Sequence, residues 1–556
     1  MTPSAPPPML PTPGPLGRRL PPLALAAALA LAPGAFAQED DRLPSLTPQE
    51  FVIRGAIQVD LPQLERQPLT GFGPPPRTFV VPADRQAVEL AFDPDVDALP
   101  ALALAPPPAP PLDLPEARAF RAEAGGGTFL ARYGRLDLDT GGASGRFYVD
   151  ADYDGIGETD GVVERDDVDR DRLDLRGGGT TLGTTRVSLD GRVLLDTYSL
   201  PAAAGDFVGQ SRRERRHLGA RAGLEGVGAV PYTLSLGYAS NRIGPTDESA
   251  GAATSRGRLD GAAEVAPGRF RLDARGGTSG EGAAGSALTY ASAGLAGVLG
   301  REDGARLVLG ARGLAYQNDD ARTDSRTVGP IVDLRLPLGE TASVFAVNRP
   351  RLAVRSLLDL TDENPFVTGE PALAPDVYVA DGRAGLALRA GAARVRLYGL
   401  GSYAPTRLIY TPAAAGLFAP SYVEATTLGA GADLALAAPS GLGLSAGVEV
   451  RSGQIVSGGD LPYYAGFVGT ASARAPFAAG RGRVGLSVHV EAARPESTVG
   501  VGDADPFALV TLDARYDIAG PFAAVARAER LVGTAERWPG FPIEGPAVML
   551  GVRFSR

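Results

Sequence analysis

Three short patterns in this sequence combine residue types at a spacing that could support chemistry, and the first two are rich in glycine. Residues 443–447 read GLSAG and match the G-x-S-x-G pattern, in which a nucleophilic serine sits on a sharp turn from strand to helix. Residues 480–485 read GRGRVG and match the G-x-G-x-x-G pattern of dinucleotide-binding loops, which requires a surrounding βαβ unit. No helix follows the first match and no βαβ unit surrounds the second. A chain with 73 glycines produces such matches freely, so we predict neither a catalytic serine nor a nucleotide site.

The third pattern is a row of carboxylates, Asp150, Asp152 and Asp154, followed by Gly155. This spacing resembles the start of a calcium-binding loop, but position twelve of that loop would be Gly161 in place of the usual glutamate. Alternate residues of a strand share one face, so the three aspartates also fit an acidic strand face. The acidic face is our default interpretation, and a calcium site is the alternative.

The wider composition is poor in residues for enzyme chemistry. The chain has no cysteine and only two histidines, His217 and His489, which excludes thiolate sites and histidine-rich metal sites. We interpret both histidines as solvated polar residues. With 54 basic and 64 acidic residues the formal charge is −10, which argues against a nucleic-acid partner. We therefore predict that the protein is not an enzyme and has no cofactor.

Residues 1–37 have the layout of a secretory signal peptide. Arg18 and Arg19 form a short basic region, residues 23–32 are a continuous run of Leu and Ala, and residues 35–37 (AFA) offer a cleavage site. After residue 37 no run of eighteen apolar residues occurs, which excludes a helical membrane protein. The sequence therefore predicts export, followed by either a soluble fold or a β-barrel in the outer membrane.

Residues 38–115 form one compositional unit, rich in proline and with short apolar stretches at 51–53 and 79–81. Such sequence favours extended, polyproline-like conformation over a packed helical bundle. It is either a periplasmic spacer or a segment that docks inside or beneath the following domain. If the following domain is a β-barrel of about 22 strands, it would leak small solutes when unplugged. We then expect inward loops, a partner protein or this segment to block it.

From residue 116 to residue 556, segments of about ten residues alternate polar and apolar side chains between turns rich in Gly, Pro, Asp and Asn. In residues 269–275, for example, Phe270, Leu272 and Ala274 alternate with charged residues. Residues 185–197 and 482–491 repeat the pattern. A soluble antiparallel sheet with one wet face has the same period, so the alternation alone does not identify a barrel.

The connectors between these segments alternate in length. We expect short turns at residues 267–268, 301–304, 337–340, 391–392 and 438–441. We expect long outer loops at residues 156–172, 200–214, 240–254, 349–376, 404–421 and 495–506. This alternation is typical of outer-membrane barrels, which have short periplasmic turns and long extracellular loops. The sequence therefore predicts an all-β fold, an antiparallel transmembrane barrel of about 22 strands with both termini periplasmic.

Tyrosines recur near the expected outer ends of the strands, as the aromatic girdle of a membrane barrel would require. The tyrosines that we assign to this girdle are Tyr153, Tyr198, Tyr238, Tyr290, Tyr316, Tyr378, Tyr403, Tyr422, Tyr463 and Tyr464. Tyrosines that flank turns in a soluble sheet are the alternative.

The C-terminus adds a resemblance to a known family. Val548, Leu550, Val552 and Phe554 alternate as in the terminal strand of outer-membrane proteins. Residues 528–542, with 545–546 and 551–554, resemble the closing hairpin of TonB-dependent receptors. Residues 363–366 (ENPF) and 371–375 (PALAP) resemble a passage from loop to strand in those barrels. The resemblance covers the barrel, about four-fifths of the chain. Those receptors carry a plug domain of more than a hundred residues before the barrel, whereas only residues 38–115 precede it here.

The resemblance implies binding or passage of a solute across the outer membrane. It also implies outer-membrane lipids and the barrel-assembly machinery as partners, with TonB or a periplasmic or lipoprotein partner as a further expectation. The alternatives are a structural or assembly barrel that does not transport, and a passive pore without TonB coupling. The residues that we expect to face the lumen and to contact the solute are Arg186, Arg192, Arg394, Arg396, Arg483, His489 and Glu491.

Overall fold

The computed structural model describes residues 118–556, with gaps in the connectors. The gaps are residues 129–130, 143–144, 157–169, 182, 201–211, 227, 229, 247–252, 282–286, 301–303, 319–322, 369–372, 414–416, 439, 497–502, 530–535, 539–540 and 543–546. The expected signal peptide and the proline-rich segment lie outside the described residues. Within the described part, no helix is long and apolar enough to cross a membrane.

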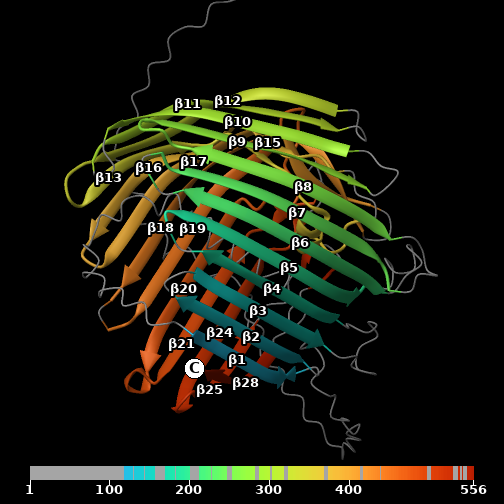
Figure 1. Cartoon of the computed structure of the whole chain (residues 1–556), viewed down its shortest axis with the longest axis vertical. Helices are drawn as coiled ribbons and strands as arrows, with labels where there is room; N and C mark the ends of the chain where they lie inside the picture. The colour runs from blue at the N-terminus through green and yellow to red at the C-terminus, as the bar shows by residue number, and fades with distance from the viewer. Residues whose placement is uncertain are drawn as a thin grey trace, which may run out of the picture. The chain divides into compact units, whose positions relative to one another are not determined.

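The described residues form a closed antiparallel barrel of 22 strands (Figure 1). Each strand pairs with its neighbour in sequence, and β1 closes the barrel against β28. The first half comprises β1 (Arg118–Gly127), β2 (Arg132–Gly142), β3 (Gly145–Ile156), β4 (Arg170–Thr181), β5 (Thr185–Ser199), β6 (Arg212–Gly226), β7 (Tyr232–Pro245), β8 (Thr254–Val265), β9 (Phe270–Glu281), β10 (Ala287–Gly300) and β11 (Arg306–Asn318). The second half comprises β12 (Thr323–Pro337), β13 (Ala342–Asn348), β16 (Ala380–Ala390), β17 (Ala393–Pro412), β18 (Phe418–Ala437), β19 (Gly443–Ile455), β20 (Phe467–Phe477), β21 (Gly482–Glu491), β24 (Phe507–Ala519), β25 (Phe522–Glu529) and β28 (Ala547–Ser555).

Short elements occupy the connectors. They are β14 (Arg351–Ala353), α5 (Leu357–Glu363), β15 (Asp376–Tyr378), the single 3-10 turn Ala478–Gly480, β22 (Arg494–Pro495), β23 (Asp503–Ala504), β26 (Glu536–Trp538) and β27 (Phe541–Pro542). The expected all-β barrel and its strand number are confirmed. The G-x-S-x-G match lies at the start of β19, a strand, as expected.

The period-2 alternation places apolar side chains outward and polar ones inward. On β7, Leu234, Leu236 and Tyr238 are 43–58% exposed, although the strand is hydrogen-bonded on both sides. On β5, Leu189 and Leu195 are exposed, while Asp196 on the opposite face is 1% exposed. Exposed leucines over most of the wall are stable only against lipid, so this face is the membrane-spanning surface.

The long connectors, at residues 157–169, 200–211, 349–379, 456–466, 492–506 and 530–546, all lie at one end of the barrel, as expected, but connectors such as 319–322 at that end are as short as the turns at the other. The turns at residues 267–268 and 391–392 are tight, and Gly268 (φ 60°) and Gly391 (φ 59°) adopt a left-handed conformation that disfavours side chains with a Cβ. Both ends of the barrel sequence, the start of β1 and the end of β28, lie at this short-connector end. The expected loops 404–421 and 240–254 are wrong in extent. β17 continues to Pro412 and β18 begins at Phe418, and β7 continues to Pro245.

The predicted tyrosine girdle is wrong for several of its members. Tyr198, Tyr290, Tyr316 and Tyr378 are only 4–8% exposed. Tyr198 lies three residues after the lipid-facing Leu195 on β5, and side chains an odd number of residues apart on a strand point to opposite faces. The Tyr198 ring therefore points into the lumen. Tyr238 and Tyr403 remain on the outer surface, 50% and 37% exposed. A second set of outward aromatic residues lies near the short-connector end: Phe120, Phe147, Phe270, Phe477 and Phe522.

Neighbouring positions on β7 test the assignment of the two faces. Leu236→Arg places a charge on the lipid face and should lower the free energy of unfolding by about 1–4 kcal/mol, depending on depth. Ser235→Arg, one residue away on the lumen face, should change it by less than about 1 kcal/mol. Urea titration of the protein in lipid vesicles measures both. A larger loss for Ser235→Arg than for Leu236→Arg would show that the two faces have been exchanged.

Candidate functional site

The described residues of the connector between β13 and β16, 349–368 and 373–379, fold into the barrel. β13 has only seven residues and ends at Asn348, halfway along β12, and β16 begins at Ala380, opposite Tyr403 of β17. Both strands therefore stop part-way up the wall, and the chain between them turns inward. Leu357, Leu360, Val367 and Val377 in this stretch are 0–1% exposed. The prediction that residues 349–376 form an exposed outer loop is wrong. We call residues 349–379 the inward segment.

Helix α5 is the centre of the inward segment, and its start is fixed locally. The Ser356 side chain accepts a hydrogen bond from the backbone N–H of Asp359, and the Asp359 carboxylate accepts one from the N–H of Ser356, which is a capping box. Inside the helix, the Thr361 hydroxyl donates to the carbonyl of Leu357 (2.9 Å). Leu357, Leu358, Leu360 and Thr361 are all buried, because so short a helix is stable only when packed on other elements.

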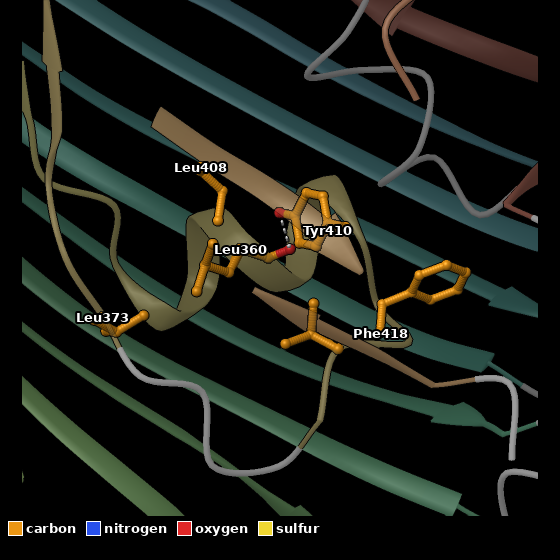
Figure 2. Close-up of a cluster of buried hydrophobic side chains, with 6 residues drawn as sticks. Leu360, Leu373, Leu408, Tyr410 and Phe418 are labelled. Carbon is orange, nitrogen blue, oxygen red and sulfur yellow. Dashed lines mark hydrogen bonds between the residues drawn. The ribbon is translucent and has the colours of Figure 1, made fainter. Parts of the chain in front are cut away.

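The helix packs in an apolar cluster that includes the long strands β17 and β18. Its buried members are Leu360, Val367, Leu373, Leu408, Tyr410 and Phe418. Figure 2 shows Leu360 and Tyr410 pointing toward one another, and the Tyr410 hydroxyl donates to the carbonyl of Leu360 (3.5 Å). Phe418 also lies edge-on to Tyr463 of the next long connector, with ring centroids 5.7 Å apart. Elements from three parts of the sequence thus meet inside the barrel.

A second apolar cluster joins the ends of the inward segment to the lumen face of β10 and β11. Leu352 of β14 and Val377 of β15 pack on Leu288 and Tyr290 of β10 and on Leu314 and Tyr316 of β11. These tyrosines are the ones that the girdle prediction had placed in lipid. Their burial is explained by the inward segment, which gives their rings an apolar partner inside the lumen.

The irregular backbone of the inward segment receives hydrogen bonds from arginines and other polar side chains of the wall. Arg312 of β11 donates to the carbonyl of Pro350 (2.8 Å), and Arg258 of β8 donates to that of Val354 (2.8 Å). Arg213 of β6, 1% exposed, donates to the carbonyls of Pro365 (3.2 Å) and Val367 (2.8 Å). Tyr198 and Asn318 make the equivalent bonds to Pro365 (2.9 Å) and Leu373 (2.7 Å). The segment is therefore fastened from several sides of the barrel.

A buried ion-pair network connects the wall to α5. Asp196, with a fully buried side chain, pairs with Arg170 (2.8 Å) and with Arg215, and Arg215 also pairs with Asp362 of the helix (3.0 Å). Arg215 is stacked against Tyr198, 5.3 Å from its ring centroid. Each charge in the network has an opposite charge beside it, which is the condition for keeping charges in a dry interior.

Arg355 makes a similar link within the inward segment. Its guanidinium pairs with Glu363 and, at 2.9 Å, with Asp376. Burial opposes the charged form, but these two carboxylates outweigh it and raise the pKa of Arg355 well above its usual value. Asp376 also accepts a hydrogen bond from the backbone N–H of Leu408 on β17 (2.6 Å). The same carboxylate therefore ties the segment to the strand beside it.

The structure places the residues expected to contact the solute on the inner wall, and most of them are paired. Arg192 binds Asp174 (2.8 Å), Arg396 binds Asp433 (3.0 Å) and Arg186 lies 3.6 Å from Glu225. His489 lies 3.0 Å from Glu491, which itself lies 3.7 Å from Arg494. Arg394 and Arg483 are exposed to the lumen. The structure does not gather these residues into one site, and their contact with a solute remains a prediction.

The carboxylates on β3 do not converge. Asp152 pairs with Arg135 of β2 (3.2 Å), and Asp150 lies in register with Asp137 on one side and Arg176 on the other. Among the described residues, no group of three or more Asp, Glu or His side chains could hold a metal ion. The second histidine, His217, is half-buried on the inner face and bonds to Asn241 (2.7 Å).

The inward segment is the part of the site that the sequence interpretation missed. Two local signals were present: the capping-box spacing of Ser356 and Asp359, and an apolar stretch at residues 357–360 that an outer loop does not need. The wall residues that hold it lie on β5, β6, β8 and β11, and sequence spacing does not connect them to it.

Comparison with known proteins supports the fold alone. No protein-family model matches the chain, and no curated protein matches it. Among solved structures, the FrpB iron transporter of Neisseria meningitidis superposes with a TM-score of 0.60 at 11% identity, over 79% of this chain and 82% of that one. FpvA of Pseudomonas aeruginosa, bound to a pyoverdine–iron complex, gives 0.59 at 15% identity over 79% and 72%. The copper transporter OprC gives 0.57 at 13% over 79% and 81%.

This chain has the barrel fold of outer-membrane receptors. The resemblance to TonB-dependent receptor barrels, first indicated by residues 528–554 and 363–375, is confirmed for the fold. At identities of 11–15% the comparisons do not transfer the iron, pyoverdine or copper of those proteins to this one.

Removing helix α5 and its flanking residues tests whether the inward segment obstructs the lumen. Replacing residues 355–368 by a short Gly-Ser linker should raise conductance in planar bilayers and sensitivity of cells to vancomycin, because it removes α5 and its apolar contacts from the lumen. The same replacement of the exposed residues 456–460 is the control and should change neither. Unchanged conductance in a correctly folded deletion variant would mean that other parts of the chain close the barrel.

The buried network predicts a large loss of stability when its central carboxylate is removed. Asp196→Asn leaves Arg170 and Arg215 without full compensation and should lower the free energy of unfolding by about 3–5 kcal/mol. Glu225→Gln breaks the half-exposed pair with Arg186 and should cost less than about 1 kcal/mol. Urea titration monitored by loss of the folded form on unheated gels gives both values. Similar losses would contradict the burial of the network.

Proposed function

We propose that the protein is an exported outer-membrane barrel that binds a solute and passes it across the outer membrane. The observation that carries the proposal is a 22-stranded barrel with a lipid-facing surface and an internal segment fastened across its lumen. A barrel of this size without internal structure would be a wide aqueous channel. The inward segment favours a receptor over a passive pore, because it occupies the space through which solutes would diffuse.

The structural neighbours suggest the first solutes to test. Their titles name a pyoverdine–iron complex, iron and copper. All are receptors or transporters, which supports a role other than catalysis for this chain. We propose coupling to TonB as the energy source, because a segment held by buried ion pairs needs work to displace, and TonB-dependent receptors have this barrel. Export through residues 1–37 and a lumenal or periplasmic place for residues 38–115 are part of the same proposal.

Uptake measurements separate this function from the two alternatives. In a strain lacking the protein, accumulation of ⁵⁵Fe supplied as ferric citrate, or of ⁶⁴Cu supplied as the cupric ion, should fall at least five-fold and return with a plasmid copy. Wild-type uptake should saturate with concentration and stop when a protonophore collapses the proton gradient.

The controls distinguish the other possibilities. Recovery of the protein in the outer-membrane fraction confirms that the complemented strain is comparable with wild type. Uptake that rises linearly and ignores the protonophore indicates a passive pore. Unchanged uptake of both metals on deletion contradicts metal transport, and a defect confined to envelope integrity would favour a structural barrel.

A further inference from the structure

Arginines lie directly opposite one another on neighbouring strands at the short-connector end of the inner wall. Arg389 of β16 faces Arg394 of β17 across the tight turn at residues 391–392, and Arg483 of β21 faces Arg515 of β24. Arg474 of β20 lies diagonally beside Arg483, since Pro476 is the direct partner of Arg483. We call Arg389, Arg394, Arg474, Arg483 and Arg515 the arginine arc.

All five side chains belong to the lumen face. Each lies an odd number of residues from a leucine or phenylalanine exposed to lipid on its own strand. These outward residues are Leu388, Leu397, Phe467, Leu486 and Leu512. Arg394, Arg474 and Arg483 are exposed, and the other two are partly exposed. The arc is therefore accessible from the water inside the barrel.

Like charges directly opposite in a sheet repel, because their Cβ atoms are only about 4.5–5.5 Å apart. Elsewhere in this barrel a carboxylate relieves such a contact. Arg176 faces Arg192, and Asp174 binds both of them (2.9 and 2.8 Å). In the arc, Arg515 pairs with Asp517 (2.8 Å), but Arg389, Arg394, Arg474 and Arg483 form no ion pair with any described residue.

Several cross-strand pairs elsewhere on the inner wall at the same end have the opposite arrangement. Glu123 of β1 faces Arg553 of β28 and pairs with it (2.6 Å), and Arg186 of β5 faces Glu225 of β6 at 3.6 Å. Arg271 pairs with Glu264 (3.2 Å). Arg306 of β11 does face Arg335 of β12, but Asp333 lies 3.4 Å from Arg335. At this end, the side from β16 to β24 therefore carries an excess of positive charge, with the five arginines of the arc against Asp513 and Asp517.

We propose that the arginine arc is a binding site for a small polyanionic solute with two or more carboxylate or phosphate groups. Guanidinium groups bind such anions through paired hydrogen bonds, and a multivalent anion can neutralise opposed arginines as Asp174 does on β4. The site rests on the proposed function, since the solute reaches this wall through the lumen. The arc assigns the solute to a chemical class, small polyanions, which the mixed charges of the whole lumen do not indicate.

Binding to the purified full chain in detergent tests the site without any uptake measurement, so its failure and that of the transport function can be told apart. The probes are citrate and pyrophosphate, measured by calorimetry at 50 mM NaCl. At least one should bind, and raising NaCl to 500 mM should weaken binding at least ten-fold. The Arg389→Gln/Arg394→Gln variant, and separately Arg483→Gln, should weaken it at least ten-fold.

Arg186→Gln is the matched control, because Arg186 lies on the same face and at the same end but is paired with Glu225. It should change affinity less than two-fold. Each variant is first shown to be folded by its heat-dependent migration on gels. The proposal is overturned if neither probe binds, or if Arg186→Gln weakens binding as much as the arc variants. It is also overturned if only a chain lacking residues 42–112 binds the probes, since the arc would then be covered by the chain itself.

Discussion

Backbone that leaves a strand at membrane depth must find hydrogen-bond partners inside the protein, and this requirement governs the interior of the barrel. The inward segment meets it through side chains that reach from the wall, above all Arg213, Arg258 and Arg312. Arginine suits this role because its five donors are spread over a long, planar group that can serve two acceptors at once. Without these donors the carbonyls of the segment would be buried and unpaired, and the chain would have to remain in the sheet.

The apolar and ionic contacts build on that framework. The cluster around Leu360 and Tyr410 holds the middle of the segment, and the cluster around Leu352 and Val377 holds its two ends. Asp376 connects them, because it binds Arg355 within the segment and the backbone of Leu408 on β17. Strands β17 and β18 extend beyond the rest of the wall because their upper parts pack against apolar residues of the inward segment in the lumen.

The architecture could be predicted from the sequence because its signals are local. Period 2 defines each strand, and the alternation of short and long connectors defines the ends of the barrel. The interior could not be predicted, because it depends on pairs far apart in the chain, such as Arg213 with Val367 or Arg215 with Asp362. The tyrosines show the limit most clearly. Tyr198 and Tyr238 look alike in sequence, but the register of one residue puts the first in the core and the second in lipid. The seven residues expected to meet the solute lie on the inner face, but only the register of neighbouring strands shows which of them are paired and distinguishes Arg394 and Arg483 from the rest.

Hydrogen bonds and apolar contacts, two of the three kinds of contact that hold the inward segment, respond differently to a polar solute. A hydrogen bond from Arg213 or Arg258 to a backbone carbonyl can be exchanged for one to a solute oxygen with little net change in free energy only when water or a solute hydroxyl donates to the freed carbonyl. The apolar clusters have no such substitute, because exposing Leu360 or Val377 to water is unfavourable in proportion to the area uncovered. The hydrogen bond to β8 is therefore easier to replace than the apolar contacts with β10, β11 and β17, whereas the contact with β6 also includes the buried ion pair between Arg215 and Asp362. The geometry of the wall thus divides the segment into an anchored base and a smaller set of replaceable polar contacts.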